Sequence, residues 1–448
     1  MYNIIIKNVE NKYDFAELIK IFLRPEEFNA YTEAEYAEKE ENCESAELFV
    51  FNEERSDDKN EIKREIYNKL SQLTGEKPAW GILTGVRPVK LTGELFQRLG
   101  TQAAVENELA HTYLLADEKI SLLTDTYNYQ QKTCGNPPNN SVGVYIGIPF
   151  CPTRCLYCSF TSNQAGDAEI TRYLEALKTE IRYVGRRMRE TGLTAESIYI
   201  GGGTPTTLTA EQLDDLLQTV EDNLDLRMLK EFTVEAGRPD TITYEKLEAI
   251  HKHKVERISI NPQSMKERTL ELIGRSHEPS DIVKAFQKAD RVGIPIVNAD
   301  LITGLPEETP EDFARTLDEI LALDPENITV HTLAVKRASR LVNVDKDFHY
   351  KQAQTVAEML KIAKEKLKAA GFRPYYLYRQ KHMAGAFENV GYCKDDTPSI
   401  YNIRIMEEKQ TILALGAGGI SKMYYPAENR LERVPNVSNY EIYISRLE

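Results

Sequence analysis

From Gly143 onward the chain repeats one pattern, in which a short apolar segment, a loop and an amphipathic helix follow one another. Short apolar runs that alternate with helices predict parallel strands joined by right-handed crossovers. Six such strands, rather than eight, predict an α/β fold built on a partial (β/α)6 barrel that is open on one side. The predicted strands are residues 144–148, 197–200, 231–235, 257–260, 296–302 and 328–333.

The segments between these strands carry helix signals. Apolar residues recur with the period of a helix from Ile170 to Met188 and predict one buried face there. Thr209 with Gln212, and Ser264 with Glu267, have the spacing of capping boxes. Thr309 before Pro310 predicts a further helix start.

Unusual residues stand at the carboxyl ends of the predicted strands, where barrels of this kind carry their chemistry. The second strand runs into a glycine-rich turn, 201–206, whose backbone could approach a ligand closely. The third ends at Glu235, the fifth contains Asp300, and the sixth runs through His331 towards Lys336. Each of these alone is equally a plain turn or a core residue. Together, at one topological position, they predict a site.

The first strand leads directly into a loop with three cysteines, Cys151, Cys155 and Cys158, at C-x3-C-x2-C spacing. Three thiolates from one loop can ligate three irons of a cubane [4Fe–4S] cluster. Phe160 stands where a C-x-C ending would add a fourth cysteine, so the fourth iron would be open to an outside ligand.

Two alternatives to a cluster are a structural zinc site and disulfide bonds. Structural zinc sites are closed by four protein ligands, and no histidine lies near this loop. The chain has only 6 cysteines in 448 residues, and the other cysteines are scattered, which argues against a disulfide framework.

Composition excludes some partners. The formal net charge is −14, which disfavours nucleic acid, because phosphate binding needs a basic surface. No apolar run reaches the roughly 18 residues of a membrane span. Reduced cysteines and the lack of an export signal predict a cytoplasmic protein.

The predicted barrel is flanked on both sides. Residues 1–140 predict a mixed α/β extension of unknown role, which ends in a linker from Gln130 to Ser141. Residues 141–345 form the predicted barrel, and residues 346–448 an α+β segment with a long helix that ends at Gly371. The chain stops within a predicted helix, so this segment is expected to be truncated or unusually short.

The motifs together resemble a known family. IPFCPTRCLYCSF, GGGTPT and NADLITGLP are similar to radical S-adenosylmethionine (SAM) enzymes, and among them to the oxygen-independent coproporphyrinogen III oxidase family. LTGVRP, MAGAFENVGYC and EEKQTILALGAGG resemble its HemZ-type branch. The resemblance covers nearly the whole chain.

The resemblance implies two cofactors, a [4Fe–4S] cluster on Cys151, Cys155 and Cys158, and SAM on its fourth iron. From the residues alone, a strand-end carboxylate is as easily a core salt bridge, a tyrosine a core aromatic, and Arg275 a surface residue. The SAM positions that the resemblance implies are Tyr145, Tyr157, Gly202, Gly203, Thr204, Glu235, Gln263, Arg275, Asp300, Ala334 and Ile420.

The implied activity is that of an oxidoreductase in heme biosynthesis that works anaerobically. It would convert propionates of coproporphyrinogen III, or a related tetrapyrrole, to vinyl groups, with electrons from flavodoxin or ferredoxin. Family members lacking the fourth cysteine, which Phe160 replaces here, include heme-binding carriers, so a carrier is one alternative and a heme methyltransferase is another. Basic residues that could meet the substrate carboxylates, or equally form a solvated face, are Lys336, Arg337, Arg340, Arg379 and Lys381.

Overall fold

A computed structural model describes residues 1–38, 47–159, 163–336, 339–343, 348, 352–380, 384–394 and 396–447. The chain forms two compact units, described separately below. The first contains residues 1–127 and short pieces at Arg379 and Phe387, and the second contains most of the remainder. Among the described helices, none has the length and apolar character that crossing a membrane requires.

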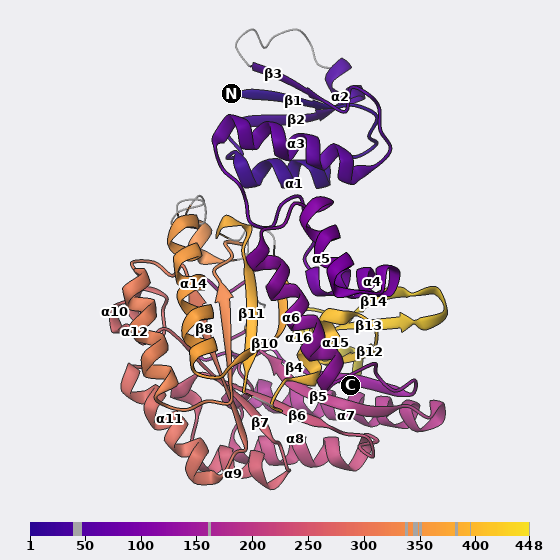
Figure 1. Cartoon of the computed structure of the whole chain (residues 1–448). Helices are drawn as coiled ribbons and strands as arrows, with labels where there is room; N and C mark the ends of the chain where they lie inside the picture. Colours follow the sequence, from indigo (N-terminus) through magenta and orange to yellow (C-terminus); the bar gives the residue numbers. More distant parts are fainter. Residues whose placement is uncertain are drawn as a thin grey trace. The chain divides into compact units, whose positions relative to one another are not determined.

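The first unit contains a small parallel sheet with strand order β2-β1-β3, formed by β1 (Tyr2–Ile6), β2 (Phe28–Thr32) and β3 (Glu47–Phe51). Helices α1 (Tyr13–Phe22) and α3 (Lys59–Thr74) lie against one face of it (Figure 1). Their apolar stripes bury Phe15, Leu18 and Ile66 on the sheet core. The remaining helices are α2 (Glu33–Ala37), α4 (Pro88–Leu99), α5 (Gln102–His111) and α6 (Asp117–Thr133).

The linker predicted from Gln130 to Ser141 is partly wrong. Helix α6 continues to Thr133, and the Gln130 side chain is buried and donates to the Tyr375 carbonyl at 2.9 Å. Glutamine is a good helix former, so the turn signals at Gly135 and Pro137 mark only the irregular connection that follows the helix.

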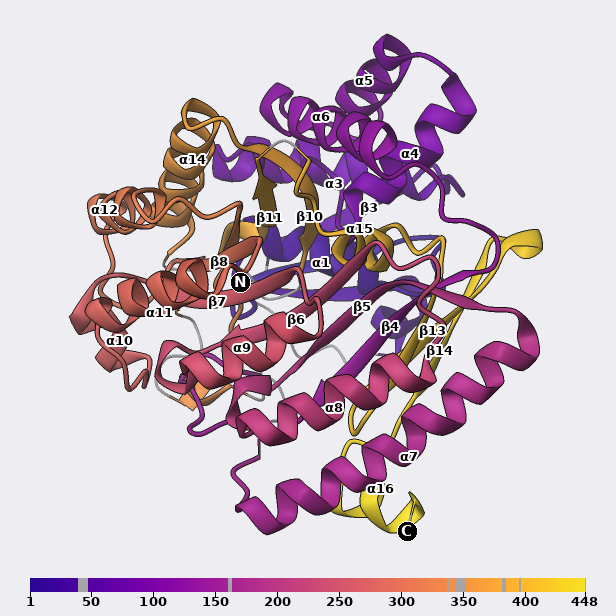
Figure 2. The same ribbon diagram turned by 90° about the horizontal axis from the view of Figure 1, so that it is seen from below.

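The second unit confirms the six predicted strands, which are parallel and lie side by side in chain order. Helices α7, α8, α9 and α11 lie along the outside of this curved sheet (Figure 2). The strands are β4 (Ser141–Ile148), β5 (Thr194–Gly202), β6 (Glu231–Gly237), β7 (Arg257–Gln263), β8 (Ile296–Thr303) and β9 (Asn327–Thr332). The helices are α7 (Asp167–Thr191), α8 (Ala210–Asn223), α9 (Tyr244–Lys252), α10 (Glu267–Leu272), α11 (Pro279–Val292), α12 (Pro310–Leu321) and α14 (Ala353–Ala369).

The C-terminal segment extends this sheet at both edges. Strand β12 (Thr411–Leu415) pairs in parallel with β4, and β11 (Glu388–Cys393) pairs antiparallel with β9. With β10 (Arg373–Arg379), β13 (Ile420–Tyr425) and β14 (Arg430–Pro435) the sheet has 11 strands. In the described part of the chain, β10 and β14 are its two edges, so the barrel is open, as predicted. The last helices are α15 (Ile400–Glu407) and α16 (Tyr440–Leu447).

Two of the three predicted helix starts are confirmed. Thr209 and Gln212 form a reciprocal capping box at α8, and Thr309 caps α12 together with Asp312. The capping box predicted for Ser264 and Glu267 is wrong. Ser264 Oγ instead donates to the buried Glu308 carboxyl and accepts from the backbone N–H of Lys266, and α10 has no side-chain cap. A buried carboxyl that needs a donor outcompetes a local cap.

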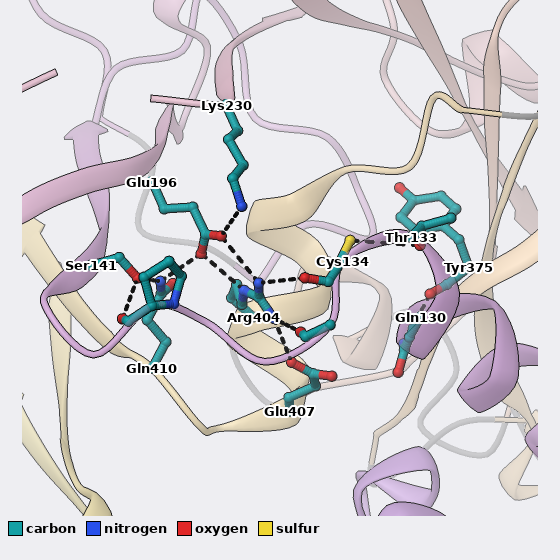
Figure 3. A network of polar contacts seen from close by, with 12 residues as sticks. Gln130, Thr133, Cys134, Ser141, Glu196, Lys230, Tyr375, Arg404, Glu407 and Gln410 are labelled. Atoms are coloured by element: carbon teal, nitrogen blue, oxygen red, sulfur yellow. Dashed lines mark hydrogen bonds and ion pairs between the residues drawn. The ribbon is translucent and has the colours of Figure 1, made fainter. Parts of the chain in front are cut away.

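A polar network surrounds the buried Glu196 near the start of β5 (Figure 3). Arg404 of α15 forms two ion-pair contacts with Glu196 of β5, at 3.0 and 3.1 Å, and both side chains are completely buried. Gln410 donates to Glu196 at 2.7 Å, and Lys230 does so at 3.0 Å. Burial raises the pKa of Glu196, but hydrogen bonds and the charge of Arg404 hold it below its ordinary value.

We expect Glu196→Gln to lower the free energy of unfolding by about 3 kcal/mol, because it removes one of the two carboxylates, those of Glu196 and Glu407, that pair with the buried Arg404 charge. Urea denaturation followed by circular dichroism measures the loss. The matched control is Arg430→Gln at the exposed Arg430–Glu428 pair, which should cost less than about 1 kcal/mol. Equal stability of the two variants would contradict the assignment.

The contribution of Glu196 to stability depends on pH with a defined sign. Since the folded-state pKa of Glu196 lies below its ordinary value of 4.5, its stabilisation is present above that pH and is lost as pH falls through the folded-state pKa. Wild-type protein should therefore lose more stability than Glu196→Gln on acidification.

Candidate cluster and SAM site

The cysteine loop is attached to the sheet at its first residues. Beyond the paired parts of β4 and β5, the N–H of Gly203 donates to the Ile148 carbonyl, and that of Thr204 to the Phe150 carbonyl, both at 2.8 Å. A Cβ on Gly203 would lie 2.4 Å from the Phe150 carbonyl oxygen, so only glycine fits there. The loop therefore starts at a fixed point on the carboxyl edge of the sheet.

The three loop cysteines are free thiols in this structure. Burial raises the pKa of Cys151, and the nearby charges of Cys158 and Cys155 raise it further, so the three groups are close enough to interact. Cys151 Sγ also lies 3.5 Å from the Thr204 hydroxyl. Phe160, which follows them, lies outside the described residues.

A mononuclear zinc site needs ligands that meet at a single ion, and structural zinc sites almost always have four protein ligands. A cubane is different, because each thiolate binds its own iron. The donor set, three thiols on one loop without a fourth protein ligand, fits a cluster with one open iron.

The glycine turn after β5 faces the same loop. Gly202 has a φ of 112°, and its N–H donates to Glu235 Oε2 at 3.3 Å. The N–H groups of Gly202, Gly203 and Thr204 are thus all engaged within the protein. The Thr204 carbonyl accepts from the N–H and the hydroxyl of Thr207. Hydrogen bonds with a ligand therefore fall to the carbonyls of Gly202 and Gly203, as acceptors, and to the Thr204 hydroxyl, which suits a cationic ligand such as an ammonium group.

Glu235, near the end of β6, is a half-buried carboxyl group. The Tyr199 hydroxyl donates to its Oε1 at 2.6 Å. Desolvation raises the pKa of Glu235 to about 7, with a further contribution from the Asp300 charge. A carboxyl with a pKa near neutrality at a strand end is a functional candidate, and a cationic ligand would favour its ionised form.

Two predicted residues keep buried polar atoms without a partner. Gln263, the last residue of β7, is buried with a φ of 69°, and its Oε1 has no hydrogen bond. Arg275 donates through Nη2 to the Tyr157 hydroxyl at 3.0 Å, while its Nε and Nη1 have no partner. Backbone strain and unsatisfied buried groups are both costly, and they concentrate where a ligand completes the site. These residues fit SAM, whose carboxylate accepts hydrogen bonds and whose hydroxyls donate them.

Asp300 of β8 lies beside His331, which the sequence predicted at the site, and near Asn298 and Tyr378, which it did not. The Asn298 amide donates to Asp300 Oδ1 at 2.7 Å, and His331 Nε2 lies 3.7 Å from Asp300 Oδ2. Tyr378 OH lies 3.4 Å from His331 Nδ1. The two-residue alternation of β8 could have indicated Asn298, since residues i and i+2 share a face with Asp300.

An aromatic stack lies beside Glu235. Tyr145 of β4 and Tyr199 of β5 are paired in register, with ring centroids 6.3 Å apart. Tyr401 of α15 stacks on Tyr199 at 4.6 Å. Burial, with the Glu235 charge, raises the pKa of Tyr145 and keeps its hydroxyl neutral. Tyr401 comes from a distant helix, and no local pattern indicates it.

The other predicted positions are less central. Ala334 follows β9 and is half-buried, whereas Ile420, the first residue of β13, is 50% exposed. Lys336 is half-buried and Arg340 exposed, and Arg337 and Lys381 lie outside the described residues. Arg379 is not a substrate-facing or solvated cation: it is buried in the first unit, over the Trp80 ring at 4.8 Å, and donates to the Ala386 carbonyl.

Comparisons with known proteins show the family of this chain. The sequence profile of the Radical SAM superfamily matches residues 145–320. The chain is 40% identical over 397 residues to the oxygen-independent coproporphyrinogen-III oxidase-like protein HemZ of Bacillus subtilis, a match that covers 87% of this chain and 79% of HemZ. It is 33% identical over 235 residues to the heme chaperone HemW of the same organism, covering 52% of this chain and 61% of HemW.

A solved structure shares the fold. The radical SAM coproporphyrinogen III oxidase HemN of Escherichia coli superposes with a TM-score of 0.55 at 21% sequence identity, over 72% of each chain.

We expect the affinity of the anaerobically reconstituted protein for SAM to rise about tenfold between about pH 6 and about pH 8, because Glu235 must be ionised to attract the cationic ligand. Its pKa of about 7 places the midpoint of this rise, with the carboxylate present above that pH. Equilibrium dialysis measures it without turnover. Glu235→Gln should flatten the profile, and Glu211→Gln, at an exposed carboxylate of α8, should not. A flat wild-type profile would contradict this role.

Proposed function

The chain belongs to the radical SAM superfamily and, within it, to the oxygen-independent coproporphyrinogen III oxidase-like proteins that include HemZ, and from this premise we propose that it oxidatively decarboxylates propionate groups of coproporphyrinogen III or a related tetrapyrrole. The observation that supports it is the site itself. A loop of three free thiols stands next to Glu235, Gln263 and Arg275, whose charges and open hydrogen-bonding atoms match SAM.

Cluster and SAM, when bound, would supply the radical chemistry that removes one hydrogen atom from a propionate side chain. That side chain would then lose carbon dioxide, pass one electron to an external one-electron acceptor, and become a vinyl group. Two such reactions give protoporphyrinogen IX. The protein orients the reacting groups and excludes water.

The chain's own residues have separate tasks in this proposal. Cys151, Cys155 and Cys158 hold the cluster. Glu235 and the glycine-turn carbonyls receive the positive groups of SAM, Arg275 receives its carboxylate, and Asp300 the ribose hydroxyls. Tyr157, hydrogen-bonded to Arg275, packs on the adenine.

The tetrapyrrole is proposed from the relatives and from charge. HemZ carries coproporphyrinogen-III oxidase in its name, and a substrate with several carboxylates needs cations at the open carboxyl side of the barrel. Lys336 and Arg340, after β9, are the described candidates. The electron donor is proposed to be a flavodoxin or ferredoxin.

A heme carrier is the second candidate. It is favoured by the similarity to the heme chaperone HemW and by Phe160, which replaces the fourth cysteine in the motif. A carrier would keep the cluster loop and the SAM residues but bind heme tightly without converting a porphyrinogen.

Anaerobic incubation with SAM, a chemical reductant and coproporphyrinogen III distinguishes the two. We expect protoporphyrinogen IX, carbon dioxide and 5′-deoxyadenosine to form, and all three to vanish in the variant with Cys151, Cys155 and Cys158 changed to Ala. The control is Cys134→Ala, which lies outside the loop and should keep activity.

Three results would contradict the oxidase. Tight heme binding with slow SAM cleavage and no vinyl product would establish the carrier. A methylated tetrapyrrole would establish a methyltransferase. Iron-free protein after reconstitution would remove the basis of all these functions.

A further inference from the structure

Arg238, to which no role is assigned above, lies directly behind the cysteine loop. It follows β6 and is only 4% exposed. The register of β6 against β7 shifts between Glu235 and Gly237, and Gly237 has a φ of 61°. This local irregularity, of the kind that re-aims a side chain at a strand end, stands immediately before Arg238.

The guanidinium of Arg238 contacts the loop between the first two cysteines. Its Nη1 donates to Thr153 Oγ1 at 2.6 Å and lies 3.4 Å from the Thr153 carbonyl oxygen. Thr153 is the middle one of the residues that separate Cys151 from Cys155. The contact therefore fixes the segment that determines how far apart these two thiols stand.

Arg238 is itself held from the opposite side. Its Nε and Nη2 donate to the two carboxylate oxygens of Asp240, each at 3.0 Å, and Nη2 also donates to Ser276 Oγ at 3.3 Å. A bidentate pair fixes the plane of a guanidinium, which lysine cannot reproduce. The donor that reaches Thr153 is thus pre-positioned by residues outside the loop.

The second half of the loop is held in a parallel manner. Arg275 donates to the Tyr157 hydroxyl at 3.0 Å, and the N–H of Leu156 donates to the Ile273 carbonyl at 2.9 Å. Each of the two spacer segments of the motif is thus contacted by one arginine, Arg238 or Arg275. Arg275 also faces the proposed SAM site, whereas the side chain of Arg238 donates hydrogen bonds to Thr153 of the loop, Asp240 and Ser276.

Charge gives Arg238 a second effect. Among the charged and titratable groups behind the loop, Arg238 and Arg275 are cationic, Asp240 is anionic, and burial lowers the pKa of His277 to about 4, so it is neutral at pH 7. The Arg238 guanidinium reaches Thr153, which lies two residues from Cys151 and two from Cys155. A buried cation next to thiolate ligands stabilises the added electron of a reduced cluster.

We propose that Arg238 is a positioning residue for the cluster, which fixes the Cys151–Cys155 segment through Thr153 and makes the cluster easier to reduce through its buried charge. The inference rests on the cluster site of the proposed function, but not on its tetrapyrrole substrate. Its test therefore needs neither turnover nor SAM.

The test compares Arg238→Gln, Arg238→Lys and Thr153→Val in anaerobically reconstituted full-length protein, with Arg268→Gln, an exposed arginine of α10, as the control. Two quantities are measured: the rate of iron loss to a chelator, and the midpoint potential of the cluster by electron paramagnetic resonance in redox titration. Circular dichroism reports folding.

We expect Arg238→Gln to lose iron roughly ten- to hundredfold faster, as for other residues that orient metal ligands, and to have a more negative potential. Arg238→Lys should have the midpoint potential of the wild type, since it keeps the charge. It should still lose iron faster than the wild type, since lysine lacks the bidentate guanidinium. Thr153→Val should lose iron faster at an unchanged potential.

The proposal would be overturned if Arg238→Gln had the same rate of iron loss and the same midpoint potential as the wild type. If that variant does not fold, an unchanged rate of iron loss in Thr153→Val overturns it instead. A wild-type protein that holds its cluster but makes no vinyl product refutes only the proposed substrate reaction.

Discussion

The site depends on one local constraint, the hydrogen bonds by which the end of β4 is fixed to the end of β5. Gly203 and Thr204 donate to carbonyls on either side of Pro149, and the absence of a side chain at Gly203 permits this approach. Because these bonds lie just before Cys151, the cysteine loop leaves the sheet in a defined direction. As a consequence, the backbone hydrogen bonds, rather than contacts between the side chains, bring the glycine turn, Glu235 and the first thiol together.

Polar groups are buried at both ends of the parallel sheet. At the amino end, Glu196 receives hydrogen bonds from Arg404, Lys230 and Gln410, and the network joins α15 to β5 (Figure 3). Buried atoms without a hydrogen-bond partner occur at both ends: Arg257 Nε and Gln410 Oε1 at the amino end, and Gln263 Oε1 and Arg275 Nε at the carboxyl end. Gln263 differs in that a strained backbone, with a φ of 69°, accompanies its open atom.

Much of this architecture follows from local patterns. The six strands, the open barrel and the cysteine loop could be predicted because apolar runs, helix periods and cysteine spacing are short-range signals. Contacts between distant segments could not. The stacking of Tyr401 on Tyr199 and the burial of Arg379 against Trp80 depend on tertiary packing. Ser264 shows the same limit on a smaller scale, since its hydroxyl donates to the carboxyl of Glu308, from another loop, and does not cap α10 as expected.

The pairing of β4 with β12 has a consequence for biosynthesis. Strand β4, which presents the cysteines, obtains one neighbour from β5 soon after it is made, but its other neighbour, Thr411–Leu415, is made only after all the other barrel strands. Throughout that interval the nascent barrel exposes a free strand edge, which is a template for pairing with other chains. Metal loading during that interval would act on an unfinished sheet, so cluster insertion is best timed after β12 has paired with β4.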